Sequence, residues 1–359
     1  MSAPVVLHLN NEPELTRRSR FTGAFRRLQA EGRLGHVPAA PRAALLRGGR
    51  RAALDSLERA VLDSRPDVVF VQSPHGFPFS YEEIARLLRL AGSPPVVYQE
   101  GDAWGGNKRL PESSRSWLRL ADAVFSVAGG AQLAMLRRIA RKPVRYVPHT
   151  LPLDCFPEQD RPAPPGDAAV FDVVTIGNSV VRARVVPRLP GAGERARVVR
   201  GLGRLGCRLG VFGSGWRGPH ALGPLPFERQ IAVLRSARMS VGWDHYGRYP
   251  GYFSDRLPIS GAAGRVHVSQ SRPGMEWLPG PQDGLHLVRT PRDVVGRVAD
   301  LLHEEQHKLD SAGERLRRWV LSHLTDLHSV QFMLGAFLPL PSPPADPWQR
   351  IAAGEGERG

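Results

Sequence analysis

Short apolar runs rich in valine recur along the chain and constrain its fold more than any other feature. In the first half they lie at 4–9, 67–73, 95–100, 122–128 and 143–149. Amphipathic segments, such as 80–92 and 130–142, separate them. The runs are apolar throughout instead of alternating with polar residues, which is typical of strands covered on both faces. Strand–helix–strand repetition of this kind predicts an α/β fold with a parallel, doubly wound sheet.

The same alternation restarts in the second half. Further strand candidates lie at 171–178, 208–215, 238–245, 265–270 and 284–288. Helix candidates lie near 194–205, 226–236, 255–263, 291–303 and 308–335. Two similar α/β units in one chain predict two Rossmann-like lobes that face each other across a cleft. Ligands of such sheets bind beyond the carboxyl ends of the strands, so the cleft is the expected site.

A proline-rich, polar segment separates the two halves and reads as an interdomain linker. The predicted organisation is an N-terminal lobe, a linker, a C-terminal lobe, helices that cross back to the first lobe, and a proline-rich tail. These parts correspond to residues 1–150, 151–169, 170–305, 306–338 and 339–359.

The formal net charge of +15 has two interpretations. Of the 49 basic residues only Lys108, Lys142 and Lys308 are lysines, and the arginines are dispersed instead of forming blocks. Dispersed arginines favour a solvated basic surface, which would attract anionic small molecules such as nucleotide diphosphates. A polyanion-binding protein remains the alternative, and its binding would weaken steeply with salt.

Cysteine usage and the N-terminus predict a soluble cytoplasmic protein. Cys155 and Cys207 lie far apart, and no Cys/His spacing typical of a zinc site is present. The N-terminal apolar run is too short for a signal peptide, and no window of the sequence is long and apolar enough to span a membrane. Because the sequence also lacks a D-x-D motif, we expect no bound metal.

Two glycine-containing turns follow predicted strands of the second half. Gly177 and Asn178 end one strand and Arg182 follows them, a combination that suits a diphosphate as well as a surface loop. Gly213 and Ser214 begin a G-x-G-x-x-G sequence that runs into Pro219 instead of a helix. It is therefore a poor dinucleotide fingerprint, although a Gly–Ser–Gly turn lets backbone N–H groups approach a ligand.

The segment 252–277 carries charged residues around a run of small ones. Ser254 or Asp255 is expected to cap a short helix, with Arg256 in its first turn, so that both would act on one anion. Glu276 lies at a predicted loop-to-helix junction, where it could accept sugar or ribose hydroxyls. The alternative interpretation of Arg256 is an exposed arginine on a capped helix. The alternative for Glu276 is a carboxylate that stabilises the N-terminus of a helix through the helix dipole.

Polar residues also follow strands of the first half. His75, Glu100 and Asp102 are candidates to position or deprotonate an acceptor hydroxyl or amine. Each has an alternative interpretation as a loop histidine or as a carboxylate paired with an arginine.

These segments resemble the GT-B glycosyltransferases, and in particular the CgeB-like (spore-maturation) group. The resemblance covers roughly 65–335 and is carried by "DVVTIGNSVVRARVV", "RLGVFGSGW" and "GYFSDRLPISGAAGRVHVSQSRPGMEWL" in the second half. It also includes "TPRDVVGRVADLLHEEQ", "SHLTDLHSVQFML" and, in the first half, "ADAVFSVAGGAQLAMLRRIARKPVRYVPHTLPL".

The resemblance implies transfer of a sugar from a nucleotide-diphosphate donor, bound by the C-terminal lobe, to an acceptor bound by the N-terminal lobe. It requires no metal or other cofactor, and the acceptor is expected to be a small molecule of secondary metabolism. Nucleic acid is not expected as a partner. The donor side would be lined by Gly177, Asn178, Arg182, Gly213, Ser214, Ser254, Asp255, Arg256 and Glu276, with Asp244, His245 and Tyr246 near the base.

The chain departs from the larger retaining relatives in one respect. Their paired glutamates would fall near Gly251 and Ile259, neither of which is acidic. The stereochemical outcome is therefore left open, and so is the need for a protein base. A nucleotide-sugar epimerase or another GT-B enzyme remains an alternative function.

Overall fold

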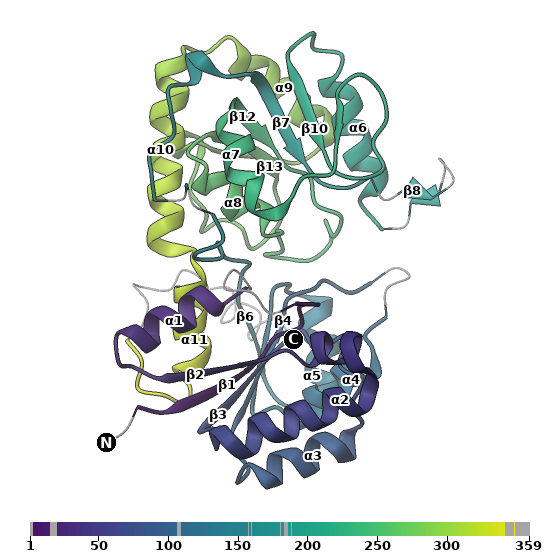
Figure 1. Cartoon of the computed structure of the whole chain (residues 1–359). Coiled ribbons are helices and arrows are strands. Elements are labelled where there is room, and N and C mark those ends of the chain that lie inside the picture. The colour runs from purple at the N-terminus through teal and green to yellow at the C-terminus, as the bar shows by residue number, and fades with distance from the viewer. Residues whose placement is uncertain are drawn as a thin grey trace. The chain divides into compact units, whose positions relative to one another are not determined.

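The computed structural model divides the chain into two compact units (Figure 1). It describes residues 3–14, 20–105, 109–156, 158, 160–179, 181–182, 186–187, 189–341 and 348. Unit 1 comprises Met1–Pro148, Pro152–Cys155 and Asp326–Gly359, and unit 2 comprises His149–Leu151 and Phe156–Thr325.

Unit 1 contains a parallel sheet of six strands in the order β2-β1-β3-β4-β5-β6. The strands are β1 (Val5–Leu9), β2 (Gly35–Ala39), β3 (Val68–Gln72), β4 (Val96–Glu100), β5 (Ala123–Ser126) and β6 (Val144–Tyr146). All residues of β3 and β4 are buried, as continuous apolar runs predict for strands with helices on both faces. The strand order reverses between β1 and β3, where ligands of such sheets usually bind.

Six helices accompany this sheet. They are α1 (Thr22–Ala30), α2 (Pro41–Ser64), α3 (Tyr81–Leu90), α4 (Glu112–Leu120), α5 (Ala131–Ala140) and α11 (Asp326–Leu334). Helix α3 begins with a capping box, because the Ser80 hydroxyl accepts the Glu83 N–H and the Glu83 carboxylate accepts the Ser80 N–H. Its apolar face, with Ile84 and Leu87, belongs to the core of unit 1.

Unit 2 contains a second six-stranded parallel sheet, in the order β11-β10-β7-β12-β13-β14. The strands are β7 (Phe171–Ile176), β10 (Leu209–Phe212), β11 (Ala221–Gly223), β12 (Ala237–Val241), β13 (Val266–Gln270) and β14 (Leu285–Val288). A separate antiparallel pair, β8 (Val181–Arg182) and β9 (Val186–Pro187), follows β7. In the main sheet the order reverses between β7 and β12.

The helices of unit 2 connect these strands and complete its core. They are η1 (Gly166–Ala168), α6 (Ala192–Leu202), η2 (Phe227–Arg229), α7 (Gln230–Arg235), α8 (Arg256–Ala262), η3 (Pro281–Asp283), α9 (Pro291–Leu302) and α10 (Gln306–His323). Val198 of α6, Met239 of β12 and Val298 of α9 are fully or almost fully buried in this core. The two predicted doubly wound sheets are therefore confirmed. Every predicted strand run overlaps an observed strand, whereas β2, β11 and the two-residue strands β8 and β9 were not predicted.

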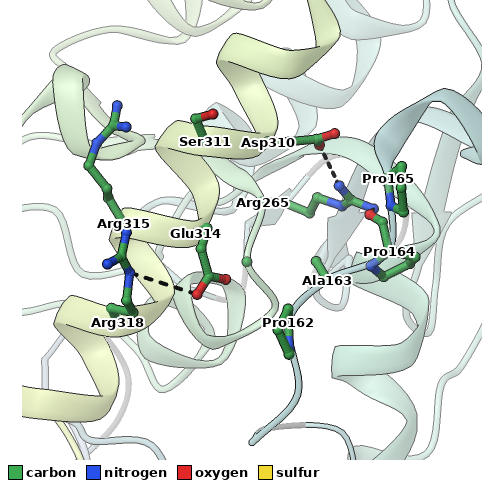
Figure 2. Close-up of a pocket in the computed structure, with 11 residues that line it drawn as sticks. Pro162, Ala163, Pro164, Pro165, Arg265, Asp310, Ser311, Glu314, Arg315 and Arg318 are labelled. Carbon is green, nitrogen blue, oxygen red and sulfur yellow. Dashed lines mark hydrogen bonds and ion pairs between the residues drawn. The ribbon is translucent and has the colours of Figure 1, made fainter.

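Much of the expected linker 151–169 packs on unit 2. The buried Arg265 guanidinium donates to the carbonyl oxygens of Pro164 (2.7 Å) and Arg235 (2.9 Å) and pairs with Asp310 at 2.7 Å (Figure 2). The Gly166 N–H donates to the other oxygen of the Asp310 carboxylate at 2.9 Å. Because backbone groups of 160–169 bond to unit 2, this part of the segment is not a free linker.

The predicted helical segment 308–335 is divided between the units. Helix α10 ends at His323 and belongs to unit 2, whereas α11 begins at Asp326 and belongs to unit 1. Thr325, between them, forms a bridge with Leu151. Of the expected crossing helices 306–338, only α11 therefore belongs to the first unit. None of the helices in the described parts of the chain has the length and apolar character needed to cross a membrane.

The tight seating of α10 generates a stability prediction. A Cβ atom added at Gly313 of α10 would lie 2.4 Å from the Gly264 carbonyl oxygen, whereas one added at Gly296 of α9 would meet nothing within 4 Å. We expect Gly313→Ala to destabilise the protein by about 1–3 kcal/mol through overpacking. Gly296→Ala should instead stabilise it by about 0.5–1 kcal/mol through helix propensity. Urea denaturation measures both, and equal effects would contradict the described packing.

Candidate functional site

The carboxyl ends of β7, β12 and β13 converge at the point where the strand order of unit 2 reverses. Gly177 directly follows β7, Asp244 lies three residues beyond the end of β12, and Arg272 lies two residues beyond β13. Because a reversal of strand order opens a crevice at the carboxyl edge of the sheet, this is where a ligand is expected.

The buried carboxylate of Asp244 organises this edge. It accepts the backbone N–H of Ser254 at 3.0 Å and the Ser254 hydroxyl at 2.7 Å. These bonds close the loop 244–254 at its two ends, and the loop leads directly into α8. Asp244 therefore fixes the position of Arg256, the first residue of that helix.

Guanidinium groups from three elements surround Asp244. Arg256 Nη2 lies 3.5 Å from its Oδ1, and Arg272 Nη1 lies 3.9 Å from its Oδ2. Arg195 of α6 approaches from the Trp243 side, where its Nε donates to the Trp243 carbonyl oxygen at 2.6 Å. We call Asp244, Arg195, Arg256 and Arg272 the Asp244 cluster.

The charges of this cluster determine the protonation state of its carboxyl group. Burial alone would raise the pKa of Asp244, but the positive charges of Arg256, Arg272 and Arg195 together hold that pKa well below its usual range. Asp244 is therefore ionised at neutral pH, and three positive charges face one buried negative charge.

Arg195 is the least compensated cation of the cluster. Its side chain is 5% exposed, and burial, followed by the charge of Arg256, lowers its pKa to about 9. Its Nη1 donates to the Asn178 carbonyl oxygen at 3.1 Å, whereas its Nη2 has no hydrogen-bond partner among the residues that the structure describes. A buried donor without a partner costs about 1–3 kcal/mol, which a bound anion would offset.

Gly177 leaves space beside these arginines. A Cβ atom at this position would lie 3.1 Å from Nη1 of Arg195 and 3.8 Å from Nε of Arg256. The glycine therefore allows both guanidinium groups to approach the backbone at the end of β7. Arg256 is 30% exposed in its side chain, in contrast to Arg272 with 1%, so Arg256 is the more accessible cation.

The Gly–Ser–Gly turn after β10 packs directly against the end of β7. A Cβ at Gly213, whose φ is +133°, would lie 2.4 Å from the Gly177 carbonyl oxygen. The Ser214 N–H donates to the Asn178 side-chain oxygen at 2.9 Å, and Trp216 Nε1 donates to the Gly177 carbonyl oxygen at 2.5 Å. The predicted residues Gly177, Asn178, Gly213 and Ser214 thus lie together, with Asn178 and Ser214 exposed.

The two predicted base-side residues that follow Asp244 are buried in the same loop. Burial, followed by the charges of Arg195 and Arg256, lowers the pKa of His245 to about 3, so this imidazole is neutral. The Tyr246 ring packs edge-on against Tyr252, with 5.9 Å between ring centroids. The side chain of Arg182 lies outside the part of the chain that the structure describes.

Two sequence predictions about this segment are wrong. Neither Ser254 nor Asp255 caps α8 with its side chain, because Ser254 bonds to Asp244 instead, and α8 has only 7 residues. Glu276 does not lie at the start of a helix: it is exposed in the turns that follow β13. The Asp244 carboxylate, and not a helix cap, therefore orders this region.

Sequence reasoning missed Arg195 and Arg272. Arg272 follows β13 by two residues, and the rule applied to the other strand ends would have found it. Besides approaching Asp244, it donates to the Tyr252 carbonyl oxygen and to the Gln270 side chain, and so ties loop 244–254 to β13. Arg195 shares the helical spacing i, i+3 and i+7 with Val198 and Leu202 of the buried face of α6, a signal that separates it from the exposed Arg197 and Arg200 and that sequence reasoning did not use.

In unit 1 the structure brings His75, Glu100 and Asp102 together. His75 Nε2 lies 2.8 Å from Glu100 Oε1, and His75 Nδ1 lies 3.2 Å from Asp102 Oδ2. His75 follows β3 and Glu100 ends β4, so this group lies at the carboxyl edge of its own sheet. Although burial alone would lower the pKa of His75, Asp102 and Glu100 raise it to about 9.

A pocket of about 500 Å³ lies at the amino end of β13, where Arg265 precedes the strand (Figure 2). Its charges are paired within the protein: Arg265 with Asp310, Arg318 with Glu314, and Arg315 with Asp283. The pocket therefore has less uncompensated positive charge than the Asp244 cluster. Within the described residues, no group of His, Cys, Asp and Glu has an arrangement suited to a metal ion.

Comparisons with known proteins agree with this architecture. Residues 195–335 match a family described as "Glycosyl transferase-like". The structure is similar to an alpha-glucosyltransferase in complex with UDP and DNA, with a TM-score of 0.66, 11% identity, and coverage of 93% of this chain and 99% of that one. No curated protein matches the sequence at a significant level.

Two further solved structures are similar over the same extent of the chain. Sucrose-phosphate synthase from Thermosynechococcus elongatus has a TM-score of 0.59 at 12% identity. Anabaena HepE in complex with UDP-glucose has a TM-score of 0.54 at 11% identity. Each comparison covers 93% of this chain and 99% of the other.

The chain has the GT-B fold. The stretch that matches the glycosyl transferase-like family begins at Arg195 and includes Asp244, Arg256 and Arg272.

The burial of Asp244 generates a second stability prediction. Removing the carboxylate with Asp244→Ala leaves Arg256 and Arg272 without their shared anion and breaks both bonds to Ser254. We expect a loss of about 3–5 kcal/mol, which is usual when a buried ion pair loses one partner. The matched control is Asp300→Ala, whose 72% exposed carboxylate pairs with Arg297 at 3.8 Å and should contribute at most about 0.5 kcal/mol. Chemical denaturation measures both, and a near-zero change for Asp244→Ala would contradict the organising role of this carboxylate.

Proposed function

We propose that the chain is a nucleotide-sugar-dependent glycosyltransferase that uses a UDP-sugar donor and whose donor diphosphate binds at the Asp244 cluster. The observation that carries this proposal is the convergence of three arginines at the topological switch point of unit 2, where Arg195 Nη2 lacks a partner among the described residues. A diphosphate supplies the oxygen acceptors and the negative charge that this arrangement lacks.

Glycosyl transfer explains why such a site needs arginines. The bond between the sugar and the nucleoside diphosphate breaks with both electrons leaving on the diphosphate oxygen, so negative charge develops there. Arginines that are already held in place stabilise this charge without reorganisation during the reaction. The cationic role that a divalent metal performs in other enzymes is proposed to fall to Arg195 and Arg256, which is consistent with a metal-independent reaction.

The choice of UDP is supported by the similar structures. The alpha-glucosyltransferase structures contain UDP or UDP-glucose, and the HepE structures contain UDP with glucose or UDP-glucose. The base would lie near loop 244–254, with His245 and Tyr246, as the sequence resemblance predicts. Membership of the CgeB-like group, carried by the segment from Gly251 to Leu278, is part of this proposal.

The acceptor is proposed to be a small molecule of secondary metabolism with a hydroxyl or amine group. The polar group of His75, Glu100 and Asp102 in unit 1 supports an acceptor of this kind, because the exposed carboxylate of Asp102 can accept hydrogen bonds from its hydroxyl or amine. Three of the similar alpha-glucosyltransferase structures contain DNA, which belongs to the complexes of that protein. Addition of a DNA duplex to the full chain with UDP-glucose tests the nucleic-acid alternative, which predicts DNA-dependent release of UDP.

A comparison of nucleotides tests the donor class. The full chain is titrated calorimetrically with UDP, GDP, ADP and TDP at one ionic strength, because the affinities of anions for a cationic site depend on salt. We expect UDP to bind most tightly. Tighter binding of GDP, ADP or TDP than of UDP would show that the donor carries a different base. If none of the four nucleotides binds, the whole proposal is contradicted.

The role of the arginines is tested by substitution. Arg256→Ala should weaken UDP binding by about tenfold to a hundredfold, the amount expected for loss of a charge-assisted hydrogen bond to an anion. Arg200→Ala is the matched control, since Arg200 is an exposed arginine of α6 outside the cluster. Arg256→Lys should be intermediate, because it keeps the charge and loses the fork of donors. An unchanged affinity of Arg256→Ala for UDP would show that the diphosphate does not bind at this site.

A further inference from the structure

The hydrogen-bond geometry of His75 reports its charge. Its Nε2 lies 2.8 Å from Glu100 Oε1 and its Nδ1 lies 3.2 Å from Asp102 Oδ2. An ionised carboxylate only accepts hydrogen bonds, whereas a neutral imidazole donates from one nitrogen and accepts at the other. A histidine between two carboxylates must therefore carry a proton on both nitrogens, which makes it a positively charged imidazolium.

Glu100 also accepts hydrogen bonds from neighbours other than His75. Its side chain is fully buried, its Oε2 accepts the Tyr98 hydroxyl at 2.8 Å, and its Oε1 accepts the Asp102 N–H at 3.0 Å. Together with the bond from His75 Nε2, the Glu100 carboxylate therefore accepts three hydrogen bonds. Both carboxylate oxygens of Glu100 thus act as acceptors, which is how an ionised carboxylate forms hydrogen bonds.

Asp102 lies at the exposed end of this array. Its side chain is 45% exposed, in contrast to 16% for His75 and 0% for Glu100. Its backbone is fixed at both ends, because its N–H donates to Glu100 and its carbonyl oxygen accepts Gln132 Nε2 at 2.8 Å. The Trp104 ring packs edge-on against His75 with 4.7 Å between centroids and closes another side of the imidazole.

We propose that His75 is a positioning residue that is positively charged at neutral pH, and that Asp102, not His75, is the catalytic base toward the acceptor. An imidazolium with both nitrogens protonated has no lone pair with which to accept a proton. Asp102 is the group of the array that is exposed to a substrate, and His75 fixes its orientation. This inference rests on the proposed glycosyl transfer.

The step balances without any further reactant. The acceptor O–H or N–H gives its proton to the Asp102 carboxylate as the acceptor atom bonds to the anomeric carbon of the donor sugar. The bond from that carbon to the diphosphate oxygen breaks, and its electron pair leaves with the nucleoside diphosphate. A base that activates the acceptor directly implies a single displacement, so the anomeric configuration should invert.

Nuclear magnetic resonance of the full chain tests the charge of His75 independently of activity. The charged and titratable groups that face this ring are Glu100 and Asp102, with the Tyr98 hydroxyl beyond Glu100. We expect the imidazole nitrogens to report the doubly protonated form up to a pKa of about 9. Glu100→Gln should lower that pKa by at least one unit, because it removes one of the two negative charges. A neutral His75 at pH 7 would overturn the inference and leave the proposed function standing.

Hydrolysis of UDP-glucose, with water as the acceptor, tests the role of Asp102. Release of UDP by the full chain is measured against pH, and Asp102→Asn should lower kcat at least a hundredfold while the affinity for UDP stays within twofold. The matched control is Asp122→Asn, whose carboxylate has the same 45% exposure and pairs with Lys142 instead. An equal loss in both variants, or full activity in Asp102→Asn, would overturn the assignment.

Two further readouts separate a base from a merely structural aspartate. Wild-type turnover should fall above pH 9, where His75 loses its charge, and this fall should move to lower pH in Glu100→Gln. The first sugar released from UDP-α-glucose should be β-glucose, and α-glucose would overturn Asp102 as the base. A wild-type chain that binds UDP but releases none from UDP-glucose would contradict both the transfer activity and the assignment of Asp102 as the base. The charge of His75 is tested separately, by nuclear magnetic resonance.

Discussion

The buried carboxylate of Asp244 is the interaction on which the organisation of unit 2 depends. It joins the end of β12 to the start of α8 through Ser254, and it lies within 4 Å of guanidinium nitrogens of Arg256 and Arg272. Without a negative charge at this point, three neighbouring arginines would repel one another in a buried environment. With it, they remain together and retain positive charge for a ligand.

Each unit uses the same property of doubly wound sheets for a different chemistry. The carboxyl edge of the unit 2 sheet gathers arginines around one carboxylate, whereas that of unit 1 gathers two carboxylates around one histidine. Cations suit a diphosphate leaving group, and carboxylates suit the hydroxyl or amine hydrogen of an acceptor. The proposed transfer reaction requires both kinds of site.

Sequence reasoning predicted the fold well because continuous apolar runs mark strands that are covered on both faces. It also placed His75, Glu100 and Asp102 in one functional group, since each follows or ends such a strand. It failed at β2 and β11, because neither "GHVPA" nor "ALG" is a continuous run of apolar strand-forming residues, and at the cap of α8, where a carboxylate ten residues earlier in the sequence competes for Ser254. The apolar face of α6, with Val198 and Leu202, places Arg195 among buried residues, but only the packing of α6 beside Trp243 gives its guanidinium group a partner there.

A crystal structure of the full chain with UDP tests the central claim most directly. The account predicts that the diphosphate oxygens lie within hydrogen-bond distance of Arg195 Nη2 and of the Arg256 guanidinium, beside Gly177. A diphosphate bound instead in the pocket of Arg265, Arg315 and Arg318, or elsewhere with Arg195 and Arg256 unchanged, would contradict it.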